Sequence, residues 1–205
     1  MVPETERLDF EAQLKQDILL GEDVPRHIAV IMDGNGRWAR SRNRPRVFGH
    51  LSGRHAVRET VMGCRELGVQ VLTLYTFSVE NWQRPPAEVS SLMRILQQTL
   101  REQRDEMREN GIRLQVVGRM EDLPRAVQNT LAETMDFLGG GRDMLLTLAL
   151  SYGGRTELTE AARAIAREVR AGTMDPEQVD EAAIAARLYT AGMPDPDLLI
   201  RTSGE

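Results

Sequence analysis

The segment 27–38 combines the pattern of a buried strand with residue types that bind anions. An apolar run over 28–32 ends at Asp33, and residues 34–37 are glycine, asparagine, glycine and arginine. Glycines let backbone N–H groups come close to an anion. The guanidinium of Arg37 can donate paired hydrogen bonds to a phosphate, and Asp33 can hold a divalent cation against it. A strand followed by a Gly-Asn turn explains a lone Gly-x-Gly equally well, so the hypothesis of a diphosphate site depends on the rest of the chain.

Arginine, glycine and small polar residues recur where other strand-like runs end. The segments that follow these runs are 33–37, 78–85, 118–119, 151–155 and 201–205. Ligands of parallel α/β sheets bind outside the carboxyl ends of the strands. We therefore expect these segments to form one long anionic site that crosses the sheet. The chain carries no Gly-x-x-x-x-Gly-Lys-[Ser/Thr] motif, which argues against a nucleotide-binding P-loop.

Strand-like and helix-like patterns alternate along the chain. Strands are predicted at 28–32, 71–77, 112–117, 145–150 and 198–200, and helices at 51–67, 86–109, 122–137, 155–171 and 180–190. The alternation predicts an α/β fold with a mostly parallel sheet flanked by helices. The helix at 86–109 has the clearest pattern, because Pro86 stands in its first turn and apolar residues follow at helical spacing.

Length and composition indicate one globular domain. With 205 residues, 41% of them apolar and 28% charged, the chain can bury one substantial core. Residues 1–24 are expected to form an N-terminal amphipathic arm, and residues 25–205 the main domain. Cys64 is the single cysteine, so disulfides and cysteine-based metal sites are excluded.

The net charge of −5 argues against a nucleic-acid-binding protein with a broadly basic surface and favours a small acidic substrate. The arginines at positions 40, 42 and 44 are interpreted as members of a solvated loop, and His27 and His55 as structural histidines. The sequence has no stretch of membrane-spanning length, and its start lacks the pattern of a signal peptide. We therefore expect a cytoplasmic protein.

The order and residue types of these motifs resemble the cis-prenyltransferase family, and within it the bacterial undecaprenyl diphosphate synthases. The resemblance runs from about residue 25 to the last residue and is carried by 27–39, 46–50 with Gly53, 74–85, 151–155 and 197–205. It implies a six-stranded, mostly parallel sheet and a homodimer. The chain has Ser151 where relatives often have asparagine, and it stops at Glu205 inside a motif. We therefore expect it to be C-terminally incomplete, without the last strand and the C-terminal segment.

The resemblance also implies a reaction. Members of the family condense isopentenyl diphosphate units onto farnesyl diphosphate, each new double bond being cis, with Mg²⁺ as cofactor. The expected product is a long-chain polyprenyl diphosphate, undecaprenyl diphosphate, which is delivered to the membrane as a carrier lipid for cell-wall synthesis. Asp33 matches the residue that holds Mg²⁺ and the diphosphate and helps to neutralise charge on the leaving group. We expect Asp33 to be essential.

Further site residues are implied by matching positions. Three polar residues match positions near the reacting carbons, where the isopentenyl unit must lose a proton: Asn35, Ser78 and Asn81. The allylic diphosphate is expected to contact Gly34, Gly36, Arg37, Arg46 and His50. The isopentenyl diphosphate is expected to contact Arg84 and Arg201, and the mouth of the site is expected to be shaped by Trp38, Phe77 and Trp82.

The growing hydrocarbon chain needs a dry tunnel, which in this family lies between two helices and the sheet. The helices that match are those predicted at 51–67 and 86–109. Candidate lining residues are Val57, Val61, Leu92, Ile95, Leu96, Leu100, Met144 and Leu146. For each of them a place in the ordinary core is an equally good interpretation, because an apolar stripe with helical periodicity first of all indicates core.

Competing functions have specific sequence signatures. A non-catalytic partner subunit of the same family is the main alternative, but such partners lack the motif present here at 33–37. A trans-prenyltransferase would be all-helical and would carry Asp-Asp-x-x-Asp motifs, of which this sequence has none. Both signatures favour a cis-prenyltransferase.

Overall fold

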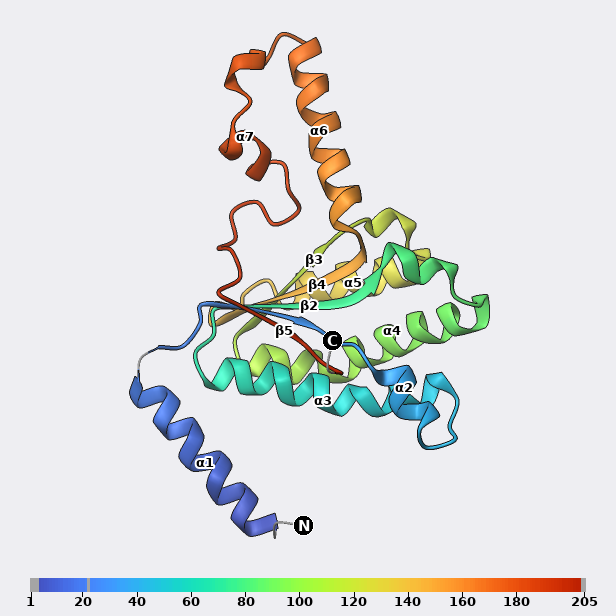
Figure 1. Ribbon diagram of the computed structural model, residues 1–205, viewed down its shortest axis with the longest axis vertical. Coiled ribbons are helices and arrows are strands. Elements are labelled where there is room, and N and C mark those ends of the chain that lie inside the picture. Colours follow the sequence, from blue (N-terminus) through green and yellow to red (C-terminus); the bar gives the residue numbers. More distant parts are fainter. Residues whose placement is uncertain (1–3, 22, 204–205) are drawn as a thin grey trace.

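The computed structural model describes residues 4–21 and 23–203. Its centre is a sheet of five parallel strands in the order β3-β4-β2-β1-β5 (Figure 1). The strands are β1 (His27–Ile31), β2 (Val71–Ser78), β3 (Ile112–Val117), β4 (Met144–Tyr152) and β5 (Leu198–Arg201). Because every pairing is parallel, the carboxyl ends of all these strands lie along one edge of the sheet. The predicted parallel α/β fold is confirmed.

Helices lie on both faces of the sheet. The α-helices are α1 (Glu4–Gly21), α2 (Asn35–Arg40), α3 (Arg46–Glu66), α4 (Pro86–Glu109), α5 (Arg125–Phe137), α6 (Gly154–Arg170) and α7 (Glu181–Ala185), and the short 3₁₀ helices are η1 (Val79–Gln83), η2 (Met120–Asp122) and η3 (Pro176–Gln178). Figure 1 shows α3 and α4 along one face, while α6 and α7 rise from the other. No helix among the described residues is long and apolar enough to cross a membrane.

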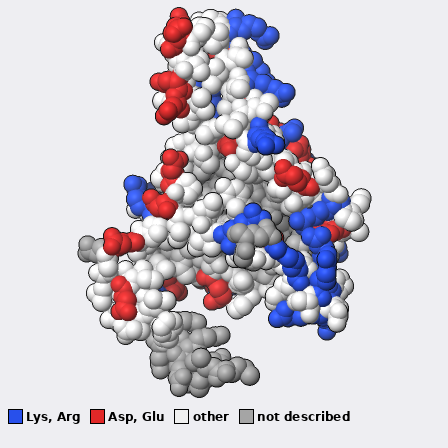
Figure 2. All heavy atoms as spheres, viewed as in Figure 1, with Lys and Arg blue, Asp and Glu red and all other residues white. Residues whose placement is uncertain are grey.

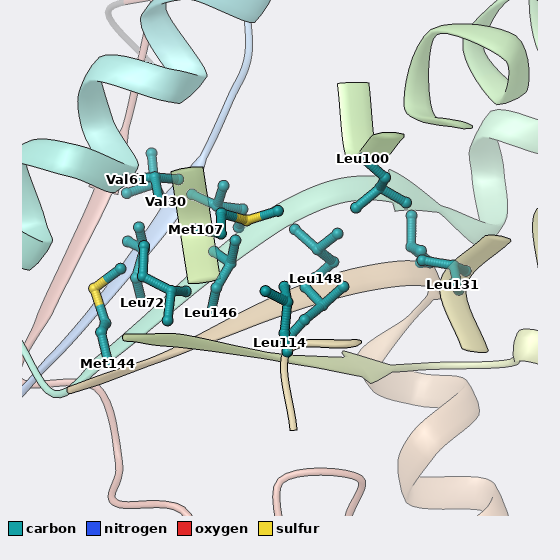
Figure 3. Packing of buried hydrophobic residues seen from close by; sticks show 14 of the residues in the cluster. Val30, Val61, Leu72, Leu100, Met107, Leu114, Leu131, Met144, Leu146 and Leu148 are labelled. Atoms are coloured by element: carbon teal, nitrogen blue, oxygen red, sulfur yellow. The ribbon is translucent and has the colours of Figure 1, made fainter. Parts of the chain in front are cut away.

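The main core lies between the sheet and the pair α3 and α4. Along α4 the buried residues Met93, Leu100 and Met107 are seven positions apart, so they share one face of the helix. In Figure 3, Val61 of α3 and Met107 of α4 point toward strand residues such as Leu146. Each fully buried side chain of this kind stabilises the fold by about 1.5–3 kcal/mol.

The sequence pattern placed most elements correctly but missed the segment that follows β1. Residues 35–40 form α2 rather than an open loop, and α3 begins at Arg46 instead of residue 51. Pro45 precedes α3 and presets the backbone for helix entry. The helix predicted at 180–190 is also shorter, ending at Ala185.

The N-terminal helix α1 points away from the sheet (Figure 1). Its Lys15 forms an ion pair with Glu66 at the end of α3. Phe10, Leu14 and Leu20 of this helix are exposed. The division of the chain into an arm, residues 1–24, and a main domain stays a prediction.

Candidate active site

A cavity of about 470 Å³ lies between α3, α4 and the sheet and reaches the carboxyl ends of β1, β2 and β5. We call its two parts the polar end and the apolar end. Residues of the polar end are Asp33, Asn35, His50, Ser78, Asn81, Arg84 and Arg201. Residues of the apolar end are Val57, Val61, Leu92, Ile95, Leu96, Leu100, Met107, Leu146 and Leu148. The cavity thus joins charged and hydrocarbon surfaces in one space.

Asp33 follows β1 directly and stands among hydrogen-bond donors. Its Oδ1 accepts a hydrogen bond from the backbone N–H of Gly34 at 2.6 Å, and its Oδ2 lies 3.0 Å from Nη2 of Arg201 and 3.2 Å from Nη2 of Arg37. The hydrogen bond from Arg201, followed by that from the Gly34 backbone, lowers the pKa of Asp33 below its ordinary value. The carboxylate is therefore ionised at neutral pH.

Strand pairing brings Arg201 to Asp33. Ile31 at the end of β1 is in register with Arg201 at the end of β5. The hydroxyl of Thr202 donates a hydrogen bond to the backbone oxygen of Asp33 at 2.7 Å. Two segments 168 residues apart in sequence therefore meet at the polar end.

Glycines at this end allow backbone segments to approach closely. Gly34 has φ of +97°, and a Cβ added there would lie 2.5 Å from Oγ of Ser203. A Cβ at the buried Gly49 would collide with the carbonyl oxygen of Asn35, and one at Gly53 would lie 2.9 Å from Oδ1 of Asn35. Because α3 has no side chains at these positions, it packs against α2 while Asn35 still lines the cavity. The sequence prediction did not include the role of Gly49.

Glu88 in the first turn of α4 was also missed. Its Oε1 lies 3.1 Å from Nη1 of Arg84, 3.7 Å from Nε of Arg46 and 4.0 Å from Nε2 of His50. The side chain of Glu88 is only 11% exposed, so its charge acts in a poorly solvated place. A sequence signal existed, since Arg84 and Glu88 are four residues apart at a helix start. The carboxylate of Glu88 thus lies near three side chains that were predicted to contact a diphosphate.

The surroundings of His50 favour its uncharged form. Burial, followed by the positive charge of Arg84, lowers the pKa of His50 below its ordinary value, and the charge of Glu88 opposes this shift. Its Nε2 is buried and has no hydrogen-bond partner in the described part of the chain. The imidazole can therefore donate or accept a hydrogen bond when a ligand occupies the polar end.

The end of β2 holds the predicted proton-transfer residues. Oδ1 of Asn81 accepts a hydrogen bond from the backbone N–H of Ser78 at 3.4 Å. The Trp82 ring meets the Phe77 ring edge-on at 4.9 Å, and its indole N–H donates to Oγ of Ser151 at 2.9 Å. Oγ of Ser151 in turn donates to Oδ2 of Asp122 at 2.9 Å. This chain of contacts, which the sequence did not predict, ties η1 to β4.

Some predicted site residues lie outside the cavity lining. Arg37, Arg46 and Trp82 contact lining residues or Glu88, whereas Trp38 stacks on Phe48 with ring centroids 6.0 Å apart and is 40% exposed. The backbone at Gly34 and Gly36 lies beside Ser203 and Arg46, respectively. All the predicted tunnel residues except Met144 line the cavity. Met144 is instead a buried core residue.

The prediction of one anionic site across the whole sheet is wrong. Arg119 and Arg155 line a separate hollow together with Thr156, Thr159, Glu160 and Arg163. The reason is topological, since β3, which precedes Arg119, is at the sheet edge, and Arg155 lies in the first turn of α6, the helix that rises from the face opposite α3 and α4 (Figure 1). Arg119 lies 3.4 Å from Asp122 and 3.5 Å from Glu160, so carboxylates balance its charge.

The polar end is compatible with a magnesium ion shared with a substrate. No group of three or more His, Cys, Asp or Glu side chains within residues 4–21 and 23–203 is arranged to hold a metal by itself. Magnesium commonly binds one or two carboxylates, several waters and substrate phosphates. Asp33, ionised and facing the cavity, fits that kind of partial protein coordination.

Comparisons with known proteins agree with this geometry. Residues 31–205 match the prenyltransferase family of undecaprenyl diphosphate synthases. The isoprenyl transferase of Chlorobaculum tepidum is 48% identical over 202 residues, which cover 98% of this chain and 76% of the relative. The farnesyl-diphosphate-specific ditrans,polycis-undecaprenyl-diphosphate synthase of Xanthomonas axonopodis pv. citri is 43% identical, over 91% of this chain and 73% of the relative.

A solved structure extends the agreement to three dimensions. The lavandulyl diphosphate synthase of Lavandula x intermedia, determined in complex with dimethylallyl diphosphate, is 34% identical to this chain with a TM-score of 0.85. The match covers 89% of this chain and 79% of that structure. From the family match, the sequence identities and the shared fold, we conclude that the chain belongs to the cis-prenyltransferase family of undecaprenyl diphosphate synthases.

Proposed function

We propose that this protein condenses isopentenyl diphosphate units onto farnesyl diphosphate with cis double bonds and makes a long-chain polyprenyl diphosphate. The observation that carries the proposal is the single cavity that joins a polar end to an apolar end. Diphosphates fit the arginines, and Asp33 fits the cation that would accompany them, whereas a growing hydrocarbon chain fits the residues between α3, α4 and the sheet. The farnesyl specificity printed for the Xanthomonas relative supports the choice of primer.

The polar end can divide the work between two diphosphates. Backbone N–H groups at 34–37, together with Arg37, Arg46 and His50, are assigned to farnesyl diphosphate. Arg84 and Arg201 are assigned to isopentenyl diphosphate. With both substrates held side by side, the bimolecular reaction gains the benefit of proximity.

The reaction breaks the allylic C–O bond, forms a C–C bond to the isopentenyl unit and releases a proton from that unit. Asp33 is assigned to the departing diphosphate and to Mg²⁺, which when bound would neutralise charge on the leaving oxygens. The polar side chains of Asn35, Ser78 and Asn81 line the cavity where the proton must leave. The released diphosphate can take up this proton, directly or through a water, and the amide and hydroxyl oxygens of these side chains can accept a hydrogen bond from that water.

Undecaprenyl diphosphate is the product we assign, as a carrier lipid for cell-wall synthesis. We further propose that the enzyme is a homodimer in the cytoplasm that acts at the inner face of the membrane. The relative from Xanthomonas has a name that specifies this product. A non-catalytic partner subunit is disfavoured, because Asp33, Asn35, Arg37 and Arg201 converge on one cavity or on its polar end.

The test is a direct assay of chain elongation. The full-length protein is incubated with farnesyl diphosphate, radiolabelled isopentenyl diphosphate and Mg²⁺, and products are separated by chain length, with a chelator in a parallel reaction. We expect labelled polyprenyl products with cis double bonds that disappear with the chelator. Absence of incorporation by the protein alone, combined with stimulation of a separate active prenyltransferase, would instead establish the partner-subunit function.

A further inference from the structure

A strongly basic segment surrounds α2 and the start of α3. Residues 34–58 include seven arginines and no aspartate or glutamate, although the whole chain has a net charge of −5. Figure 2 shows blue side chains gathered over the part of the surface formed by α2 and the loop that follows it. This segment has more arginines than contact the polar end of the cavity.

Three of these arginines have no part in the candidate active site. Arg40, Arg42 and Arg44 are exposed, and no carboxylate of the described residues pairs with any of them. Arg37 and Arg46, by contrast, face Asp33 and Glu88. The three positions were interpreted from sequence as a solvated loop, but the structure gives two of them specific neighbours.

Those neighbours are exposed aromatic rings. The guanidinium of Arg42 lies 4.2 Å from the centroid of the Trp38 ring, and that of Arg44 lies 5.4 Å from the Phe48 ring. The two rings are stacked, with an interplanar angle of 14°. Trp38 is 40% exposed, Phe48 is 39% exposed and the nearby Leu51 is 43% exposed. Apolar rings and unpaired cations thus share one surface.

We call this surface the docking face and define it by Trp38, Arg40, Arg42, Arg44, Phe48 and Leu51. We propose that the docking face binds the surface of an anionic lipid bilayer. Arginines are attracted to acidic headgroups, while tryptophan, phenylalanine and leucine gain by entering the boundary of the acyl chains. A surface that bound only phosphate groups would not account for the exposed apolar side chains of Phe48 and Leu51.

The position of the docking face favours a bilayer over a nucleic acid. Asn35 in α2 and His50 in α3 line the cavity, and the docking face occupies the same two helices and the loop between them. A bilayer bound there would lie next to the polar end, where an amphiphilic prenyl diphosphate must enter or leave. The inference rests on the proposed function, which places the enzyme at the inner face of the membrane, and it names the surface that would bind there; lipid binding requires no turnover, so the two can fail separately.

The test is vesicle binding by the protein and by a variant with three substitutions, Arg40→Gln, Arg42→Gln and Arg44→Gln. Sedimentation with vesicles of equal parts phosphatidylglycerol and phosphatidylcholine gives the partition coefficient. Because each cation contributes roughly a fivefold gain near an acidic surface, we expect the triple variant to bind about 100-fold more weakly. Vesicles of phosphatidylcholine alone should bind both proteins weakly.

A matched control removes the same charge elsewhere. Arg163, Arg167 and Arg170 are exposed residues of α6, and their triple replacement by glutamine should leave vesicle binding within about twofold of the unaltered protein. Equal loss in the α6 variant would overturn the proposal, since binding would then depend on total charge. Unchanged binding by the first variant would overturn it as well.

A tryptophan probe distinguishes lipid from other polyanions. In a Trp82→Phe variant Trp38 is the single tryptophan, since the chain has two, and its emission is selected by excitation at a wavelength that tyrosine does not absorb. We expect anionic vesicles with brominated acyl chains to quench Trp38 and shift its emission to the blue. Failure of quenching, together with binding of a DNA duplex that is lost in the triple variant of the docking face, would assign this surface to nucleic acid and refute the membrane proposal. Neither readout depends on chain elongation, so an inactive protein would still give a decisive answer.

Discussion

The polar and apolar ends of the cavity are built on different principles. At the polar end, the identity of each residue matters, because Asp33 lies 3.0 Å from Arg201 and Glu88 lies 3.7 Å from Arg46 in directed contacts. At the apolar end, side chains from α3, α4 and the strands fill or border space without directed bonds. Substitutions at the polar end should therefore affect the reaction, whereas substitutions at the apolar end should affect the volume available to the hydrocarbon chain.

The elements that supply the two ends differ in the same way. Residues of the polar end lie at or just after strand ends or near helix starts, where one residue earlier or later would face elsewhere. Residues of the apolar end recur along α3 and α4 at helical spacing, so neighbouring turns repeat the same kind of surface. Specific interactions are thus concentrated where the sheet ends.

The largest expected effect is that of Asp33→Ala. Loss of the carboxylate assigned to Mg²⁺ and the leaving diphosphate should lower kcat on the order of 1,000-fold, about 4 kcal/mol in the activation barrier. Asp143→Ala is a matched control, since Asp143 forms a carboxylate–arginine pair with Arg65 at the opposite edge of the sheet. The control should retain normal turnover. An Asp33→Ala enzyme with more than about a tenth of the normal rate would disprove the assignment.

The apolar end should respond in product length. Leu146→Ala and Met144→Ala both shorten buried side chains of β4, and each should lower the free energy of unfolding by about 2–4 kcal/mol. Only Leu146 lines the cavity, so only its replacement should extend the space available to the hydrocarbon chain. Urea denaturation measures the first effect, and chromatography of labelled products measures the second. Longer products from both variants would remove the distinction between cavity lining and core.

The sequence predicted the polar end residue by residue where motifs were dense. Asp33, Asn35, Ser78 and Asn81 all line the cavity, because the ends of parallel strands converge at one sheet edge. Glu88 was missed, since an acid in a first helical turn is ordinary at any helix start. Glu88 has this role because α3 places Arg46 and His50 beside it. No local sequence pattern indicates that packing.

The limits at the apolar end have another cause. Helical periodicity identified the faces of α3 and α4 correctly, yet it could not separate Met144 from Leu146, which are buried to similar degrees. Strand order likewise could not be read from local pattern, and it is this order that puts Arg119 in a separate hollow. Long-range packing decides both questions.

A smaller effect is expected from Glu88→Gln, which keeps the shape of the side chain but removes its charge. Arg46 and Arg84 should then lose their common anchor, and the KM for the prenyl diphosphates should rise about tenfold, equivalent to ~1.4 kcal/mol. Because the negative charge of Glu88 raises the pKa of His50 against burial, the variant should lower that pKa further. NMR titration of His50 measures this shift.

The matched control is Glu106→Gln, because Glu106 also lies on α4 and pairs with an arginine of α3, Arg58, and neither residue lines the cavity. Its replacement should leave the His50 pKa and both KM values unchanged.

The sign for stability follows from the lowered pKa of His50: the unfolded chain takes up the proton first, so stability falls as pH drops below about 6.5 and through the folded pKa. A raised His50 pKa in Glu88→Gln would contradict the proposed electrostatics.

The smallest expected effect separates the two substrates at the polar end. Arg201→Lys keeps the positive charge near Asp33 but replaces a planar fork of donors by a single ammonium. The side chain of Arg201 is 44% exposed, so solvent can compensate part of the loss, and we expect roughly a fivefold increase in the KM for isopentenyl diphosphate. The KM for farnesyl diphosphate should stay within about twofold. Arg155→Lys in the separate hollow should change neither value. Steady-state kinetics with each substrate varied in turn measures these constants, and equal increases for both substrates would place Arg201 at the farnesyl diphosphate instead.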